Sequence, residues 1–158
     1  MVAAPNDESI LRRINRYTDW RILGKGGTAT VYRVHDSDLG CDVAIKILKP
    51  EILQNSSSRE YMLEGLRNEV RISRRLRHEN ICAIHDLYDG PEGFGTVMDL
   101  IDGIELRDWM NQHLKDRLAT TPQRLELLRR LSEALAYAHT AIVHRDLKPQ
   151  NVFLRNKD

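Results

Sequence analysis

The sequence has few of the residues that form disulfide frameworks, and no long apolar run. It contains 2 cysteines, Cys41 and Cys82, which are far apart and form no CxxC motif. Two isolated cysteines without a secretory leader favour reduced thiols. No apolar stretch free of charge is long enough to cross a bilayer. We therefore expect a cytoplasmic protein with no membrane segment.

An excess of charge of one sign is also lacking. The 24 Lys and Arg residues almost balance the 23 Asp and Glu residues, which gives a formal net charge of +1. A near-neutral chain has no broad field to attract nucleic acid or an anionic membrane, so we expect no nucleic-acid partner. With 41% hydrophobic and 30% charged residues, the composition is that of a globular protein with a core.

The first two thirds of the sequence predict an antiparallel sheet and one long helix. Strand-like runs alternate with glycine-bearing or polar turns, and Asp-Gly-Pro-Glu-Gly at 89–93 suits a hairpin. Apolar residues at helical spacing predict a helix between the third and fourth strands. The expected strands are 20–23, 30–34, 42–48, 82–87 and 94–100, and the expected helix is 59–77.

A change to helical periodicity near Gly103 predicts a second lobe. A short helix is expected at 105–113, and a longer one begins at Thr121-Pro122, where threonine caps and proline fits the first turn. The fold class is therefore α+β. The expected parts are an N-terminal extension at 1–18 with room for a short helix at 9–16, a strand-rich lobe with its connector at 19–102, and a partial helical lobe at 103–158.

A glycine-rich segment from Gly24 to Val31 lies between the first two predicted strands. Missing side chains let backbone N–H groups approach phosphate oxygens closely. Alone the segment is weak evidence, because glycine-rich hairpin turns are common. A strand-to-helix dinucleotide fold is disfavoured, because Thr30 and Tyr32 continue the pattern of a strand.

Lys46 is the one charged residue in the apolar run 43–48. Such an apolar run is typical of a buried strand, and a buried lysine needs an anionic partner. Glu69 on the predicted helix is a candidate, and the pair would hold Lys46 against nucleotide phosphates. An ordinary structural ion pair is the alternative.

The segment His-Arg-Asp-Leu-Lys-Pro-Gln-Asn at 144–151 places a carboxylate, a cation and an amide within six positions. Asp146 would orient and deprotonate an attacking hydroxyl, and Lys148 would neutralise charge on a transferred phosphate. Asn151 would be a ligand of Mg²⁺. The alternative is an ordinary polar loop, which would not require this order and spacing.

Together these motifs resemble those of the eukaryotic-type, or Hanks-type, protein kinases, a class that includes bacterial members, from about Trp20 onward. Leu-Lys-Pro after Asp146 is similar to the Ser/Thr branch. The resemblance implies a protein kinase-like fold, with a five-stranded antiparallel sheet and a helix before the first helices and catalytic loop of the second lobe. It also implies ATP and Mg²⁺ as cofactors and a protein substrate with a Ser or Thr hydroxyl.

The resemblance further implies a set of nucleotide-binding residues. These are Leu23, Gly24, Gly26, Val31, Ala44, Lys46, Glu69, Met98, Asp99, Leu100, Glu105 and Phe153. Val31 and Ala44 would cover the adenine on one side and Phe153 on the other. All three would fit an ordinary core equally well.

Four of these residues lie at the end of the last expected strand of the sheet or just after it. Met98 would be the gatekeeper, and Asp99 and Leu100 would offer the backbone groups of the hinge. Glu105 would reach the ribose. A core position for Met98 and a solvated first-turn carboxylate for Glu105 are the alternatives.

Three features depart from the family pattern. Ala29 stands at the usual third glycine of the loop, and Ser73 stands where an aliphatic residue is common. No Asp-Phe-Gly occurs, although its aspartate is the main Mg²⁺ ligand of the kinase template. We therefore expect a truncated kinase that alone binds nucleotide weakly and transfers phosphate poorly.

Two other functions fit the same residues. The first is a non-catalytic, pseudokinase-like module that binds a nucleotide or a partner. The second is self-association through the apolar face of the 128–135 helix, which a truncated second lobe would leave uncovered.

Overall fold

A computed structural model describes residues 16–53, 56–113, 120–141 and 146–156. The chain divides into two compact units. The first comprises the residues up to Arg74 together with Ala83–Leu100, and the second comprises Arg75–Cys82 and the residues from Ile101 onward. The short helix expected at 9–16 lies outside the described residues, apart from Arg16.

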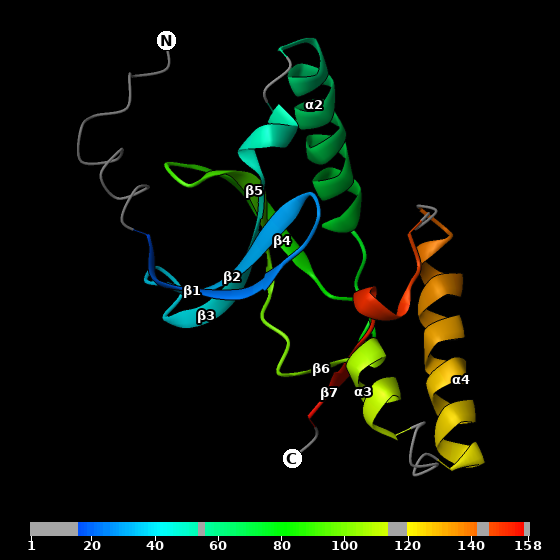
Figure 1. Ribbon diagram of the computed structural model, residues 1–158. Helices are drawn as coiled ribbons and strands as arrows, with labels where there is room; N and C mark the ends of the chain where they lie inside the picture. The colour runs from blue at the N-terminus through cyan, green and yellow to red at the C-terminus, as the bar shows by residue number, and fades with distance from the viewer. Residues whose placement is uncertain (1–15, 54–55, 114–119, 142–145, 157–158) are drawn as a thin grey trace. The chain divides into compact units, whose positions relative to one another are not determined.

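The first unit is a five-stranded antiparallel sheet in the order β1-β2-β3-β5-β4, with one long helix (Figure 1). Its elements are β1 Tyr17–Lys25, β2 Ala29–Asp36, β3 Cys41–Leu48, a 3-10 helix at Pro50–Leu53, α2 Ser56–Ser73, β4 Ile84–Gly90 and β5 Gly93–Asp99. Helix α2 packs beside β4. The predicted α+β class and its five-stranded sheet are confirmed.

Helix α2 ends at Ser73, four residues before the predicted end at Arg77. Apolar residues continue at helical spacing to Leu76, so the sequence predicted a helix that extends beyond Ser73. Leu76 is buried, but it belongs to the second unit. The sequence pattern therefore joined two segments that pack in different units.

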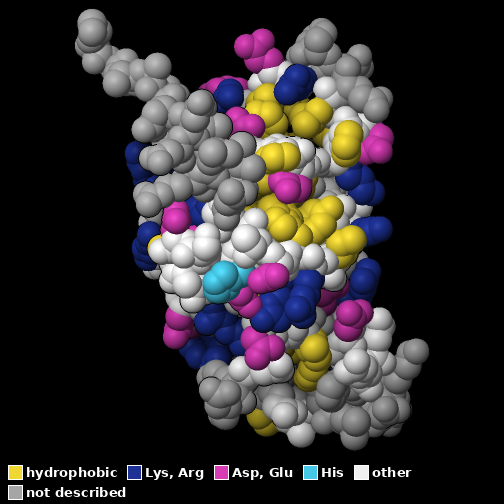
Figure 2. Space-filling view, turned by 90° about the vertical axis from the view of Figure 1, so that its left-hand side faces the viewer, with side chains coloured by type: hydrophobic (Ala, Val, Ile, Leu, Met, Phe, Trp, Pro, Cys, Tyr) yellow, Lys and Arg dark blue, Asp and Glu magenta, His cyan; other side chains and the backbone are white. Residues whose placement is uncertain are grey.

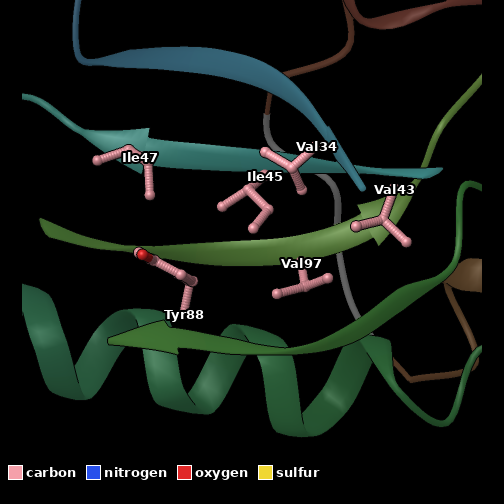
Figure 3. Close-up of a cluster of buried hydrophobic side chains, with 6 residues drawn as sticks. All are labelled: Val34, Val43, Ile45, Ile47, Tyr88 and Val97. Atoms are coloured by element: carbon pink, nitrogen blue, oxygen red, sulfur yellow. The ribbon is translucent and has the colours of Figure 1, made fainter. Parts of the chain in front are cut away.

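The core of the first unit lies on one face of the sheet. Figure 3 shows its side chains next to one another across β2, β3, β5 and β4. They are Val34, Val43, Ile45, Ile47, Val97 and Tyr88. Tyr17, Trp20 and Tyr32 pack against them, and ring pairs in this group meet edge to face with centroids 5.4 to 5.7 Å apart. Burying each large apolar side chain contributes about 1.5 to 3 kcal/mol, so this face dominates the stability of the sheet.

The opposite face of the sheet carries a different set of residues. Because successive residues of a strand point to opposite faces, Ala44 and Lys46 alternate with the core residues of β3. The register places Lys46 opposite both Val31 and Thr96, and it places Ala44 opposite Met98. The packing of the core therefore determines which residues share this second face.

A close approach of backbones holds β3 and β5 together at Gly95. This residue pairs with Ile47, and a Cβ built on it would overlap the backbone carbonyl oxygen of Lys46. Any side chain at position 95 would push the two strands apart at the point where Lys46 is presented.

A buried carboxylate anchors the start of β1. The Asp36 side chain is 1% exposed, and its two oxygens accept hydrogen bonds from Arg16 Nε at 3.0 Å and Nη2 at 2.7 Å. The backbone N–H groups of Asp38 and Leu39 also donate to it. Arg16 in turn accepts hydrogen bonds at its carbonyl oxygen from Ser37. The turn after β2 thus fixes the entry into β1.

The second unit contains helices and a two-stranded sheet. Its elements are β6 Gly103–Glu105, α3 Leu106–His113, α4 Thr121–Ala138, a 3-10 helix at Pro149–Asn151 and β7 Phe153–Arg155. The pairing of β6 with β7 was not predicted, because three-residue strands leave no readable period. The N-cap of α4 is Thr120, one residue before the predicted cap, and the Gln123 side chain accepts hydrogen bonds from it.

Charged side chains of both signs lie around a central group of hydrophobic side chains on one face of the molecule (Figure 2). On the face drawn in Figure 2, Lys and Arg side chains are interspersed with Asp and Glu side chains. This mixture agrees with the net charge of +1. No helix in the described part of the chain is both long and apolar enough to cross a membrane.

Asp36→Asn is expected to lower the free energy of unfolding by about 2 kcal/mol, because it weakens the hydrogen bonds of a buried charge pair. Asp38→Asn is the matched control. Its carboxylate lies 3.6 Å from the same Arg16 but is 65% exposed, so the expected change is below about 0.5 kcal/mol. Urea denaturation followed by circular dichroism measures both. Equal losses in the two variants would contradict the anchoring role of Asp36.

The same pair predicts a loss of stability in acid. Burial would raise the pKa of Asp36, but hydrogen bonds from Arg16, its charge, and the N–H groups of Leu39 and Asp38 outweigh burial and lower the pKa below 3.8. Its contribution is therefore complete above the ordinary carboxyl pKa and is lost as the pH falls through the lowered value. Unfolding measured between neutral pH and pH 2 is expected to depend less steeply on pH in Asp36→Asn than in the wild type. An equally steep pH dependence of unfolding in the two proteins would contradict this contribution of Asp36.

Gly95→Ala is expected to destabilise the first unit by about 1 to 3 kcal/mol, because the added methyl group overlaps the β3 backbone. Gly65→Ala is the contrast, since a Cβ at this position on α2 meets no atom within 4 Å. Alanine in a helix is expected to stabilise by about 0.5 to 1 kcal/mol relative to glycine. Thermal unfolding of the two variants should therefore shift in opposite directions. An unchanged thermal unfolding in Gly95→Ala would mean that the close approach of the β3 and β5 backbones does not require glycine at position 95.

Candidate functional site

The second unit brings Asp146, Lys148 and Asn151 together on one short loop. Lys148 Nζ lies 2.9 Å from Asp146 Oδ1 and 2.7 Å from Oδ2. Asn151 Nδ2 donates to the carbonyl oxygen of Asp146 at 2.8 Å and to its Oδ2 at 3.0 Å. The three residues singled out from the sequence thus form one hydrogen-bonded group. His144 and Arg145 of the same motif lie outside the described residues.

Local backbone structure holds this loop. The 3-10 helix at Pro149–Asn151 follows Lys148, and Asn151 N donates to the carbonyl oxygen of Lys148 at 2.9 Å. Val152 then accepts a hydrogen bond at 2.8 Å from the N–H of Leu106, the first residue of α3. The loop is therefore fixed at its far end by the helix that follows β6.

The loop presents a base and a cation to solvent. The side chain of Asp146 is 65% exposed, and that of Lys148 is 47% exposed. Because the amide nitrogen of Asn151 donates to Asp146, its amide oxygen points elsewhere and can accept a cation. An exposed carboxylate beside a lysine and an oriented amide can take a proton and stabilise added negative charge.

Two buried oxygen atoms near this loop accept no hydrogen bond within the described part of the chain. Glu105 Oε2 and Gln150 Oε1 are buried and accept no hydrogen bond from any described residue, although Arg107 Nη2 lies 3.4 Å from Glu105 Oε2. A buried acceptor left unpaired costs about 1 to 3 kcal/mol. Glu105 was predicted, whereas Gln150 was missed, and its place in the 144–151 motif was the available signal.

Phe153 lies beside this group on β7. Its Cα is paired with that of Glu105 in β6, and the residue is 43% exposed. An exposed ring next to a carboxylate offers an apolar surface and a polar contact to one ligand. In the described residues of the second unit, Glu105, Phe153 and the 146–151 loop are thus linked through β6, β7 and the 3-10 helix.

In the first unit, the glycine-rich segment is the connection from β1 to β2. The N–H of Gly26 donates to the carbonyl oxygen of Ala29 at 2.8 Å, which closes the turn. A Cβ at Gly24 or Gly27 would meet no atom within 4 Å. Their missing side chains therefore leave space beside the backbone, as a bound phosphate would require. Leu23 just before them is 53% exposed.

Lys46 is exposed, and not buried as its apolar neighbours suggested. The reason is alternation, because Lys46 points away from the core face on which Ile45 and Ile47 lie. Glu69 is also exposed, on α2, and no ion pair joins it to Lys46 in the ranges that the structure describes. The pairing of Lys46 with Glu69 remains a prediction.

The predicted hinge begins at the end of β5. Met98 is paired with Ala44, which is 5% exposed, so the two lie side by side on the face of Lys46. The N–H of Asp99 donates to the carbonyl oxygen of Ala83 at 3.0 Å, and Asp99 Oδ1 lies 2.9 Å from His85 Nε2. Sequence reasoning missed His85. Leu100 is the last residue of the first unit.

Comparison with known proteins gives a consistent result. The sequence model of the family described as Protein kinase domain matches residues 17–158. The serine/threonine-protein kinase PrkC of Bacillus subtilis is 32% identical over 142 residues, which cover 88% of this chain and 20% of that protein. The probable serine/threonine-protein kinase SCO3848 of Streptomyces coelicolor is 36% identical over 145 residues, with the same coverage of 88% and 20%.

Solved structures agree with the sequence comparison. The crystal structure of the Mycobacterium tuberculosis PknI kinase domain matches with a TM-score of 0.71 and 28% sequence identity. The match covers 89% of this chain and 55% of that one. The chain thus spans about a fifth of the length of the two curated relatives and about half of the solved domain.

Proposed function

The chain belongs to the protein kinase domain family, as its motifs predicted, and from this premise we propose that it carries the ATP-binding strands and catalytic loop of a Ser/Thr protein kinase. The observation that carries the proposal is the hydrogen-bonded group of Asp146, Lys148 and Asn151. The reaction transfers the terminal phosphoryl group of ATP to a Ser or Thr hydroxyl of a protein.

In this proposal Asp146 accepts the proton of the substrate hydroxyl while that oxygen bonds to the γ-phosphorus. The bond from the γ-phosphorus to the bridging oxygen breaks, and ADP leaves. Lys148 stabilises the negative charge that spreads over the transferred group. The contacts of Asn151 with Asp146 support the role of Asp146 as proton acceptor, because they fix the orientation of its carboxylate before the substrate arrives.

The family resemblance suggests ATP contacts within each unit. In the first unit, backbone N–H groups at Gly24 and Gly26 and the side chain of Lys46 would contact phosphates, and the backbone of Asp99 and Leu100 would read the adenine edge. Apolar contacts to the base would come from Leu23, Val31, Ala44 and Met98. In the second unit, Phe153 would offer an apolar contact to the base, and the Glu105 carboxylate, whose Oε2 lies 3.4 Å from Arg107 Nη2, would accept a hydrogen bond from a ribose hydroxyl.

The oxygen donors on the catalytic loop fit Mg²⁺, which prefers carboxylate and amide oxygens. Asn151 would hold the ion through its amide oxygen. When bound, Mg²⁺ supplies charge neutralisation between the phosphates. The sequence has no Asp-Phe-Gly, so the main ligand of the kinase template is not among these residues.

A second candidate is nucleotide binding without transfer. One observation favours it: no ion pair joins Lys46 to Glu69 among the described residues. Leu125 and Leu128 of α4 are 60% and 57% exposed, which is compatible with self-association through this helix. Two free cysteines support a cytoplasmic location for either function.

The test combines binding with turnover. Calorimetry with Mg·ATP is expected to give weak binding, reduced about tenfold or more by Lys46→Met because a phosphate contact is lost. Asp146→Asn should bind ATP within about twofold of the wild type, because the carboxylate is assigned to chemistry and not to affinity.

Radiolabelled ATP with a generic Ser/Thr substrate then separates the two candidates. Slow transfer that falls about 100-fold or more in Asp146→Asn supports a kinase. Binding without transfer supports the non-catalytic candidate. Transfer that survives Asp146→Asn, or a chain that binds no ATP, would contradict the proposal, and Asp38→Asn serves as a surface control.

A further inference from the structure

A β-bulge places His85 at the end of the sheet that leads to the hinge. The ladder between β4 and β5 pairs Ile84 with Met98 and then Asp86 with Val97. His85 is therefore the extra residue on β4, with no partner of its own in the ladder. Bulges of this kind redirect a side chain and often occur next to functional sites.

The redirected side chain contacts the first residue of the hinge. His85 Nε2 lies 2.9 Å from Asp99 Oδ1, and because a carboxylate only accepts, the imidazole donates. Asp99 Oδ2 accepts the N–H of Ala83 at 3.4 Å, and the N–H of Asp99 donates to the Ala83 carbonyl oxygen at 3.0 Å. Asp99 is thus held at its carboxylate and at its backbone by residues that precede and form the bulge.

These contacts lie on the face of the sheet opposite to Lys46. Asp99 is paired with Val43, a core residue, whereas Met98 is paired with Ala44 on the Lys46 face. Neighbouring residues of β3 point to opposite faces, so the carboxylate of Asp99 is directed away from the face of Ala44. His85 therefore acts on that face only through the backbone of Asp99.

We infer that His85 is a positioning residue for the nucleotide, which, through Asp99, fixes the hinge backbone that faces the adenine. The inference rests on the proposed function, because it concerns the adenine contact of that site. It adds a residue outside the motifs. A merely structural role predicts something different: an exposed His–Asp pair adds little stability and would affect no ligand selectively.

Ligands that contain or lack adenine separate the two roles. Adenosine, Mg·ATP and tripolyphosphate are titrated calorimetrically into the 158-residue chain. His85→Ala is expected to weaken the binding of adenosine and of ATP by the same factor, about 3 to 10, as for one lost hydrogen bond. The affinity for tripolyphosphate is expected to stay unchanged. His85→Gln should restore binding to within about twofold, because its amide nitrogen can donate where Nε2 did.

The chain provides a matched control. His35 Nδ1 lies 2.9 Å from Asp42 Oδ1 between β2 and β3, so His35→Ala removes a His–Asp contact of the same length that does not involve Asp99 or the β4 bulge. We expect this variant to bind all three ligands like the wild type. Circular dichroism melting shows that each variant is folded before titration.

Each outcome bears on a defined claim. Equal adenosine affinity in wild type and His85→Ala overturns the inference but not the proposed function. The same holds for a loss of adenosine affinity that His85→Gln does not restore. It also holds for a loss of adenosine affinity that His35→Ala shares. Weakened tripolyphosphate binding in His85→Ala also overturns it, because the effect would not be specific to adenine. A wild-type chain that binds none of the three ligands overturns the proposed function and this inference together.

Discussion

The pairing of β3 with its two neighbours is the constraint on which the first unit depends. Strand β3 is hydrogen-bonded to β2 on one side and to β5 on the other, and its Val43, Ile45 and Ile47 side chains fill the core. A shift by one residue would turn these side chains to the wrong face, so burial fixes the register. The same register presents Ala44 and Lys46 on the other face, beside Met98. The hydrophobic core therefore determines which residues lie on the face proposed to bind the nucleotide.

The second unit uses hydrogen bonds where the first uses apolar burial. Asn151 holds the backbone and side chain of Asp146, and β6 and β7 place Glu105 beside Phe153. Few apolar side chains are buried here, among them Leu106, Ala134 and Ala138. A site built on short strands and a loop depends on such local contacts. The described residues of the first unit are thus ordered mainly by core packing, and those of the second by local polar contacts.

Much of this architecture was predictable because it repeats along the sequence. Alternating apolar residues predicted the sheet, and the spacing of Asp146, Lys148 and Asn151 predicted a group that the structure brings together. Features that depend on tertiary contacts were not predictable. The bulge at His85 is one extra residue in a ladder and leaves no period, and β6 and β7 are too short to show one. Lys46 looked buried because its neighbours are apolar, although strand alternation turns it to the other face.

We propose that the face carrying Ala44 and Lys46, and not the core face, binds the nucleotide. Amide chemical shifts of the ¹⁵N-labelled chain during titration with Mg·ATP test this assignment most directly. We expect progressive shifts at Gly26, Val31, Lys46 and Leu100, and unchanged amides around the Asp36 anchor. Shifts confined to the Asp36 region, or no shifts at ATP concentrations that calorimetry shows to be saturating, would contradict it.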